Sequence, residues 1–266
     1  MYSTASRRTL AFKIAALLAG SGLLASVGLS QAAETSVDVE RGADNAIRVA
    51  QSETAPMIPQ ADSSPDAAGS SVAASTVEAP PSLGSVDVDD LMAEGPLPDI
   101  VIGEADAPVT IVEYASMTCG HCANFHVNSY PRIKKDFIDT GKAKLILREF
   151  PFDPRALAAS MLARCTGDDA KRTAMVDVLM QQQDEWARAE NASAALLKFA
   201  KLAGMSQDDF TACLNDKELQ RKVVETQERG QNEFGVNATP TFFVNGEKYS
   251  GALGPDEMAA VIESHL

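Results

Sequence analysis

Two cysteines separated by two residues, Cys119 and Cys122, are the residues whose types and spacing point most directly to chemistry. Thiols at this spacing interconvert between a dithiol and a disulfide, so the motif indicates thiol–disulfide exchange. The motif follows an apolar run over residues 109–115 that predicts a buried strand, and it opens a stretch to about residue 137 that predicts a helix. We therefore expect a redox site where a strand gives way to the N-terminus of a helix.

The start of this helix favours Cys119 as the nucleophile. A helix N-terminus has unpaired N–H groups and the positive end of the macrodipole, and both stabilise a thiolate. We expect the pKa of Cys119 to lie below the free value of roughly 8.5, and a protonated His121 would add a second stabilising charge. Cys122 lies one turn further along, so we expect it to be less exposed and to resolve the mixed disulfide.

Metal binding is the alternative for these two thiols. Zinc sites usually have four ligands, often supplied as two short-spaced pairs. The chain has no second close pair of cysteines, and His126 could be a third ligand but leaves a fourth missing. The sequence therefore favours redox chemistry without a metal or cofactor, with His126 as a solvated helix residue that could tune the site.

The N-terminus indicates export. Residues 1–33 combine three basic residues with an apolar stretch over 14–29 and small residues at the end, which is typical of a cleaved signal peptide. An uncleaved membrane anchor is the alternative. We expect a periplasmic or otherwise exported protein, in a compartment where disulfides persist. The formal charge of −14 argues against nucleic-acid binding.

Residues 34–95 have the composition of a disordered acidic linker. Twelve acidic residues oppose only Arg41 and Arg48, aromatic residues are absent, and the segment has no sustained apolar periodicity. Such a segment cannot bury enough apolar surface to offset its ordering entropy. A short helix near residues 87–93 is the one element expected here, and it could mediate self-association.

Residues 96–266 are long enough to form one domain with its own core. The sequence predicts an edge strand at 100–102, a central strand at 109–116, a strand at 144–150, four or five helices over about 155–234, a hairpin at 239–250 and a last helix from 255 to 265. The strand–helix–strand unit predicts parallel pairing. We therefore expect an α/β domain whose mixed sheet has helices on both faces.

Three further residues attract attention by their position. Glu113 lies inside the apolar strand, six residues before Cys119, where an unpaired buried carboxylate would be costly. Its alternative is a solvent-facing place at a sheet edge.

Cys165 and Cys213 lie in the predicted helical block, and in an oxidising compartment we expect them to form a structural disulfide. Two buried free thiols are the alternative for this pair.

Taken in order along the chain, these features resemble the DsbA-like thiol–disulfide oxidoreductases, which have a thioredoxin fold with an inserted helical domain. The resemblance covers about residues 98–266. It is carried by the Cys-Gly-His-Cys motif after a strand, by the inserted helices and by Ala-Thr-Pro-Thr at 238–241 before the hairpin. The Gly-His dipeptide departs from the Pro-His of the best-known DsbA proteins and resembles protein disulfide isomerase.

The resemblance implies roles for specific residues. Thr239 and Pro240 match a pair joined by a cis peptide bond beside the active cysteines, which leaves the Thr239 backbone free to pair with an extended substrate. Glu113 matches an acid beneath the second cysteine that exchanges a proton with Cys122. A second disulfide in the inserted domain also occurs in some members of this family.

The expected function is the introduction of disulfides into reduced or misoxidised exported proteins through the Cys119–Cys122 pair. Re-oxidation by a quinone-coupled membrane partner is implied by the resemblance. An isomerase or reductase, oligomeric through residues 34–95, is the alternative within the same chemistry. A chaperone or metal-delivery module without catalysis is the alternative of another class. We expect a monomer, because like charges gathered in residues 34–95 would repel one another.

Overall fold

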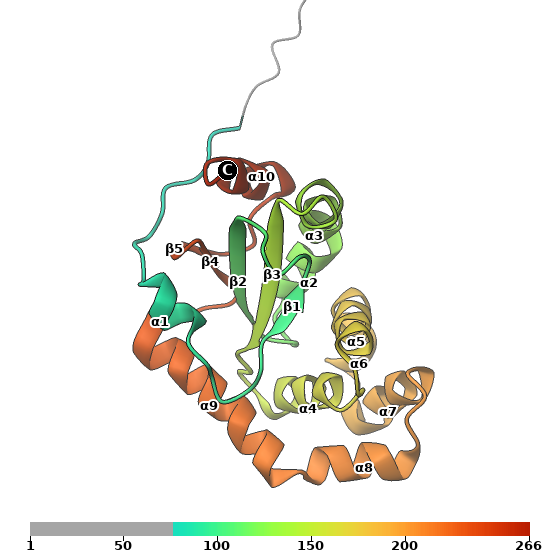
Figure 1. The fold of residues 1–266 in the computed structure, drawn as a ribbon. Coiled ribbons are helices and arrows are strands. Elements are labelled where there is room, and N and C mark those ends of the chain that lie inside the picture. The colour runs from blue at the N-terminus through green and yellow to red at the C-terminus, as the bar shows by residue number, and fades with distance from the viewer. Residues whose placement is uncertain (1–76) are drawn as a thin grey trace, which may run out of the picture. The chain divides into compact units, whose positions relative to one another are not determined.

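A five-stranded mixed sheet organises residues 77–266, the part of the chain that the computed structural model describes (Figure 1). The strands are β1 (Ile100–Ile102), β2 (Val109–Ala115), β3 (Ala143–Glu149), β4 (Thr241–Val244) and β5 (Glu247–Ser250). Their order is β1-β3-β2-β4-β5, so β2 is central. The β2–β3 pair is parallel, as predicted, and the other pairs are antiparallel. The expected signal peptide at 1–33 lies outside the described residues, as does the expected linker as far as residue 76.

The central strand is buried on both faces because helices cover both sides of the sheet. Val109 and Ile111 pack on one face with the helical segment that follows β2 and with the C-terminal helix α10 (Pro255–Glu263). Val112 and Tyr114 point to the opposite face and pack with Phe234. Alternate residues of a strand point to opposite faces, so a strand covered on both sides is apolar nearly throughout.

The segment after β2 is helical, but not uniformly so. It comprises α2 (Gly120–Asn124), a π-helical turn η1 (Phe125–Ser129), α3 (Tyr130–Ile133) and a second π-helical turn η2 (Lys134–Ile138). The predicted helix from 119 to about 137 is therefore confirmed in extent. Pro131, which lacks a backbone donor, lies at the start of α3, and a π-helical turn lies on either side of that helix. Such turns are often found at functional sites.

Six helices separate β3 from β4, within nearly the limits expected for the insertion. They are α4 (Pro154–Arg164), α5 (Asp169–Gln181), α6 (Gln183–Trp186), α7 (Ala192–Leu202), α8 (Gln207–Asn215) and α9 (Lys217–Phe234). The element beyond the predicted four or five is the single turn α6. Its Trp186 is buried, and the indole N–H donates to the Leu179 carbonyl at 2.8 Å. Trp186 belongs to the same hydrophobic cluster as Cys122, so the core of the insertion is continuous with the redox motif.

Residues 83–92 pack against the domain, which corrects the expected extent of the linker over 34–95. The Leu83 N–H donates to the Lys248 carbonyl at 2.8 Å, so the segment runs beside β5. It continues into α1 (Val88–Met92), which confirms the short helix expected near 87–93. Leu91 is buried against the sheet face that carries Tyr114. An average over the acidic stretch concealed this anchor, because one or two apolar residues hardly alter the composition.

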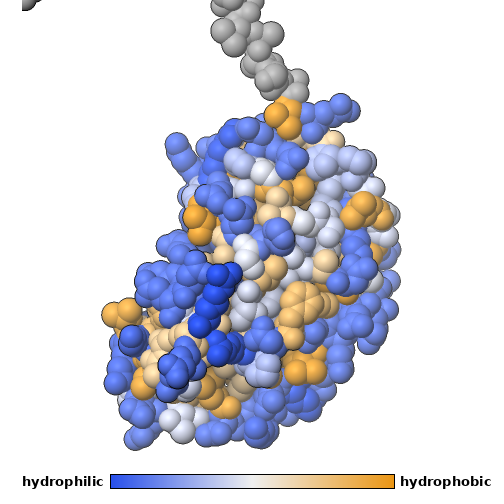
Figure 2. Space-filling model, turned by 180° about the vertical axis from the view of Figure 1, so that it is seen from behind, coloured by the Kyte–Doolittle hydropathy of each residue, from blue (hydrophilic) through white to orange (hydrophobic). Residues whose placement is uncertain are grey.

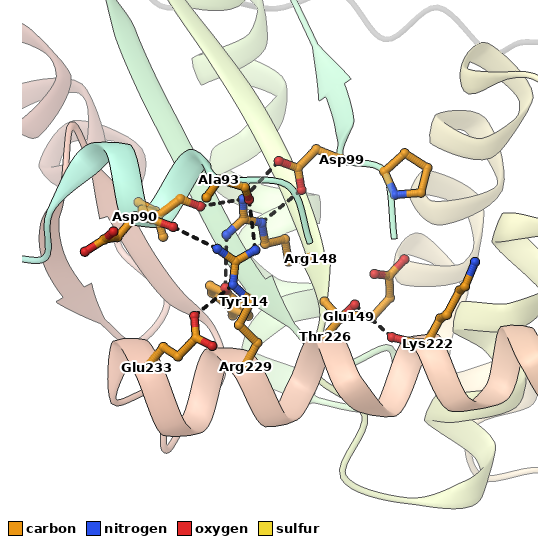
Figure 3. A network of polar contacts seen from close by, with 12 residues as sticks. Asp90, Ala93, Asp99, Tyr114, Arg148, Glu149, Lys222, Thr226, Arg229 and Glu233 are labelled. Atoms are coloured by element: carbon orange, nitrogen blue, oxygen red, sulfur yellow. Dashed lines mark hydrogen bonds and ion pairs between the residues drawn. The ribbon is translucent and has the colours of Figure 1, made fainter. Parts of the chain in front are cut away.

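Arg148 of β3 fixes the start of the domain from within (Figure 3). Its guanidinium donates to both carboxylate oxygens of Asp99 at 2.9 Å, to the Leu91 carbonyl at 2.8 Å and to the Tyr114 hydroxyl at 3.1 Å. The side chain of Arg148 is buried, and a buried charge is tolerated when it is paired and hydrogen-bonded. The network therefore ties α1 and the segment after it to the central strands.

Arg229 of α9 supports α1 from the outside (Figure 3). It donates to the carbonyls of Asp90 at 2.8 Å and Ala93 at 2.9 Å, at the end of the short helix. The last carbonyls of a helix lack their usual partners within it, and Arg229 supplies a donor to these two, in addition to the Ala93 N–H that reaches the Asp90 carbonyl at 3.4 Å. On the face shown in Figure 2, apolar residues form separate patches among hydrophilic ones.

Candidate active site

Cys119 occupies the N-cap position of α2, immediately after the central strand and the short loop that follows it. Its side chain is partly exposed, and Sγ donates to the Thr239 carbonyl oxygen at 3.3 Å. Cys122 lies one turn into the helix and is completely buried. Both cysteines are free thiols in this structure. The arrangement therefore offers one thiol to a partner and shields the other, as the sequence predicted.

The surroundings of Cys119 favour its thiolate. The pKa of Cys119 is lowered to about 5, chiefly by a hydrogen bond from the Cys122 side chain. Partial burial opposes this effect, while the side chain of Thr239 and the backbone N–H groups of Cys122 and His121 add to it. His121 thus contributes through the helix N-terminus, and its side chain is exposed. These are charge-stabilising hydrogen bonds of the kind that activate a cysteine.

Cys122 has the opposite character. Burial raises its pKa far above the ordinary value, and the hydrogen bond to Cys119 and the negative charge of Glu113 act in the same direction. Only a thiolate attacks a disulfide. Cys122 must therefore lose its proton to a neighbouring group at the moment when it reacts.

The loop before β4 brings Thr239 and Pro240 to Cys119 from 120 residues away. The peptide bond between them is cis, as expected. The Thr239 hydroxyl is buried and has no hydrogen-bond partner within residues 77–266. When Cys119 becomes a thiolate, this hydroxyl can donate to it, which accounts for the contribution of Thr239 to the low pKa.

Glu113 of β2 and His126 of η1 form a buried pair. The two side chains are 0% and 2% exposed, and His126 Nε2 lies 3.0 Å from Glu113 Oε2. The alternative that Glu113 faces solvent at an edge is therefore wrong, and so is the expectation that His126 is a solvated helix residue. Burial lowers the pKa of His126, but the charge and hydrogen bond of Glu113 outweigh it, so the pKa is raised.

Two contacts that the sequence did not predict hold the motif from the insertion. The Gln183 side-chain amide donates to the carbonyls of Met117 at 2.8 Å and Cys119 at 3.0 Å. The Thr118 hydroxyl donates to Asp153, the N-cap of α4. Asp153 followed by proline is a recognisable helix start, whereas nothing local to Gln183 indicates its role. Both ends of the loop before α2 are thus fixed by the inserted helices.

The other two cysteines form a disulfide between the end of α4 and α8. Cys165 and Cys213 are bonded and lie 48 residues apart. The expected pairing is confirmed, and the alternative of two free thiols is wrong. This pair belongs to a cluster of its own with Met161 and Val223, and not to the cluster that contains Cys122. The disulfide therefore lies in a part of the core separate from the redox motif.

Within residues 77–266, no group of three or more His, Cys, Asp or Glu side chains is placed to hold a metal ion. His126, the third ligand considered for zinc, is engaged with Glu113. In the same part of the chain no helix has both the length and the apolar character needed to cross a bilayer.

Comparison with known proteins identifies the family. A family model described as thioredoxin matches residues 97–264. The crystal structure of α-DsbA1 from Wolbachia pipientis is 33% identical, with a TM-score of 0.61 over 67% of this chain and 95% of that one. The chain belongs to the DsbA-like thioredoxin family. The DsbA-like fold is also that of BdbD from Bacillus subtilis, at 23% identity and a TM-score of 0.58 over 68% of this chain and 96% of that one.

Among curated relatives, a chain from Rickettsia felis that is named as a protein-disulfide oxidoreductase is 33% identical over 168 residues. The match covers 63% of this chain and 60% of the relative's length. The predicted thioredoxin fold with an inserted helical domain is thus confirmed for this DsbA-like chain. Five of the residues that the sequence singled out lie around the start of α2. They are Cys119, Cys122, Glu113, Thr239 and Pro240.

Proposed function

We propose that this protein is an exported thiol–disulfide oxidoreductase that introduces disulfides into substrate proteins through Cys119 and Cys122. One observation carries the proposal. Cys119 is a partly exposed thiol whose pKa is lowered to about 5, and its buried resolving partner follows three residues later. A cysteine that served only for packing would have no reason to be exposed and acidic.

The exchange proceeds in two steps from the oxidised enzyme. A substrate thiolate attacks Cys119 Sγ, the Cys119–Cys122 bond breaks, and Cys122 leaves and takes up a proton. A second substrate thiolate then attacks the substrate sulfur of the mixed disulfide, and Cys119 leaves as a thiolate. Two electrons pass from the substrate to the enzyme. A thiol of low pKa leaves readily, so the acidity of Cys119 speeds release of the oxidised product.

The same acidity supports the direction of the reaction. Stabilising the Cys119 thiolate stabilises the reduced enzyme relative to its disulfide, which makes the pair more oxidising. The Thr239 backbone beside Cys119 would pair with an extended stretch of the substrate. This pairing would hold the substrate thiolate next to Cys119 Sγ, the sulfur that the thiolate attacks. Reduced or misoxidised exported proteins have such stretches before they fold.

We propose a periplasmic or otherwise exported monomer that is delivered by the cleaved signal peptide at residues 1–33. A quinone-coupled membrane oxidase would restore the Cys119–Cys122 disulfide. The similarity to α-DsbA1 supports this setting, since it extends over nearly the whole of that chain.

Transfer of disulfides to reduced, unfolded ribonuclease tests the proposal. The oxidised full-length protein, purified from the exported fraction, is expected to oxidise one dithiol per molecule, and Cys119→Ser to oxidise none. Reduced Cys122→Ser should accumulate a mixed disulfide with scrambled ribonuclease, because the Cys119 thiolate attacks a substrate disulfide and no second active-site thiol is present to resolve the product. Activity on scrambled ribonuclease without net oxidation would favour the isomerase, and assisted refolding by Cys119→Ser would favour a chaperone. Either result would contradict the proposed function.

A further inference from the structure

The pair of Glu113 and His126 leaves two buried hydrogen-bonding atoms without partners in the described part of the chain. Only one oxygen of Glu113 and one nitrogen of His126 take part in their contact. Glu113 Oε1 and His126 Nδ1 are buried and have no hydrogen-bond partner within the described part of the chain. Buried polar atoms without partners are rare and costly. A carboxylate oxygen left free in the core therefore calls for a functional reason.

The free oxygen belongs to the acid that acts on the buried thiol. Cys122 and His126 are four residues apart, so their side chains lie on the same face of the helix. Both are buried, and Glu113 of β2 contacts His126. The charge of Glu113 reaches Cys122, since it is one of the causes that raise the Cys122 pKa. Glu113 therefore acts on Cys122 through its charge and on His126 through a hydrogen bond.

The surroundings of His126 favour the imidazolium. Asp177 of α5 adds its negative charge to that of Glu113. The Tyr130 ring of α3 lies 5.3 Å from the imidazole, between ring centroids, and its buried hydroxyl has no partner within residues 77–266. Burial, Asp177 and Glu113 raise the pKa of Tyr130, so this hydroxyl remains neutral. Two acids therefore face one imidazole.

The last helix also packs on η1, but its acids are engaged elsewhere. Asp256 of α10 pairs with Arg132. Glu257 accepts from the Gly254 backbone N–H at 2.8 Å, at the start of the same helix. Glu113 and Asp177 are therefore the acids whose charge reaches His126.

We propose that His126 is a positioning residue for disulfide exchange, which holds Glu113 as an ionised carboxylate whose free oxygen accepts the proton of Cys122. The proposal rests on the proposed function. The resemblance already implies proton exchange at Glu113, and the new element is that His126 makes this exchange possible. An unpaired carboxylate in the core would instead take up a proton and become neutral, and a neutral carboxyl group cannot accept another.

The step starts from the mixed disulfide between Cys119 and the substrate. Cys122 transfers its proton to Glu113 Oε1, and its sulfur attacks Cys119 Sγ. The Cys119–Cys122 bond forms, the bond between Cys119 and the substrate breaks, and the substrate leaves as a thiolate. In the oxidising direction the same proton returns from Glu113 to Cys122 as Cys122 leaves. His126 keeps its own proton throughout.

Reaction of the reduced full-length protein with one equivalent of Ellman's reagent separates the two thiols. The first coloured thiolate is released when Cys119 attacks, and the second when Cys122 resolves the mixed disulfide. We expect His126→Asn to keep the first phase and to slow the second about tenfold at neutral pH. Glu113→Gln should slow the second phase by about 100-fold at every pH, the lower range for loss of a general base. The double variant should be no slower than Glu113→Gln, since the two residues act as a unit.

Each outcome decides the matter. A second phase at wild-type speed in His126→Asn, equal slowing of both phases, or additive effects in the double variant would overturn the role of His126. A wild type without the rapid first phase would overturn the proposed function, and this proposal with it. If His126→Asn fails to fold, ¹⁵N imidazole shifts in the wild type provide the answer, because the chain has only three histidines. His126 charged at pH 7 and neutral in Glu113→Gln is expected, and a neutral His126 in the wild type would overturn the proposal.

Discussion

The low pKa of Cys119 makes the stability of the reduced protein depend on pH in a defined window. The folded pKa is about 5, against an ordinary value of 9.0. Below pH 5 the thiol is protonated in both the folded and the unfolded protein, so it contributes nothing. Between pH 5 and pH 9 only the folded protein holds the thiolate, so the contribution grows with pH, and it is fully present above pH 9.

The size of the effect follows from the shift. A pH of 7 is about two pH units above the folded pKa. Each pH unit above that pKa contributes about 1.36 kcal/mol, so the thiolate contributes about 2.7 kcal/mol to stability at pH 7. Cys119 is partly exposed, and solvent screening weakens such interactions. We therefore expect about 1–2 kcal/mol of stability at pH 7 that Cys119→Ser lacks and that disappears on acidification to below pH 5.

Urea unfolding of the reduced wild type and of Cys119→Ser at pH 5 and pH 7 measures this contribution. The reductant opens the Cys165–Cys213 disulfide in both proteins, so its effect cancels in the comparison. The free energy of unfolding should favour the wild type more at pH 7 than at pH 5 by about 1–2 kcal/mol. Thiolate absorbance at 240 nm should rise with a midpoint near pH 5 in the wild type only. Parallel stabilities at the two pH values, or a first titration at Cys122, would refute the reasoning.

Three further variants test other contacts. Gln183→Ala removes two hydrogen bonds from the loop before α2 and should cost about 1–2 kcal/mol in urea unfolding, whereas the surface change Gln182→Ala should cost nothing. Replacing Cys165 and Cys213 together by alanine should lower stability by about 4 kcal/mol and leave the alkylation profile of the active-site thiol unchanged; a shifted profile would show that the disulfide reaches the site. Arg229→Ala removes two hydrogen bonds at the end of α1 and should speed proteolysis near α1 without loss of disulfide transfer, and unchanged proteolysis would show that Arg229 is dispensable there.

The sequence was most informative where a short stretch determines both structure and chemistry. The cysteine spacing, the apolar strand before it and the Asn-Gly turn at 245–246 each predict their element without knowledge of the rest. The positions of Cys119 at a helix start and of Pro240 before a strand followed directly. The Cys165–Cys213 bond was predictable because the sequence predicts export to an oxidising compartment and Cys119 and Cys122 pair within their own motif, which leaves one pairing for the other two cysteines.

The sequence was least informative where a contact joins distant elements. His126 has the helical spacing of the buried residues Cys122 and Ser129, so its burial was readable, but its partner on β2 was not. Gln183 acts from a single helical turn whose position depends on the packing of the insertion. The anchor at Leu91 was concealed because composition was averaged over an acidic stretch.

The segment over 83–86 has a consequence for how the protein meets unfolded chains. Its pairing with β5 closes one edge of the sheet, and the strand at the other edge, β1, is only three residues long. Bare edges recruit extended polypeptides and seed aggregation. A protein proposed to handle such polypeptides would otherwise sequester them along its own sheet. With both edges poorly available, the proposed pairing of substrate with the Thr239 backbone beside Cys119 has little competition from the edges of the sheet.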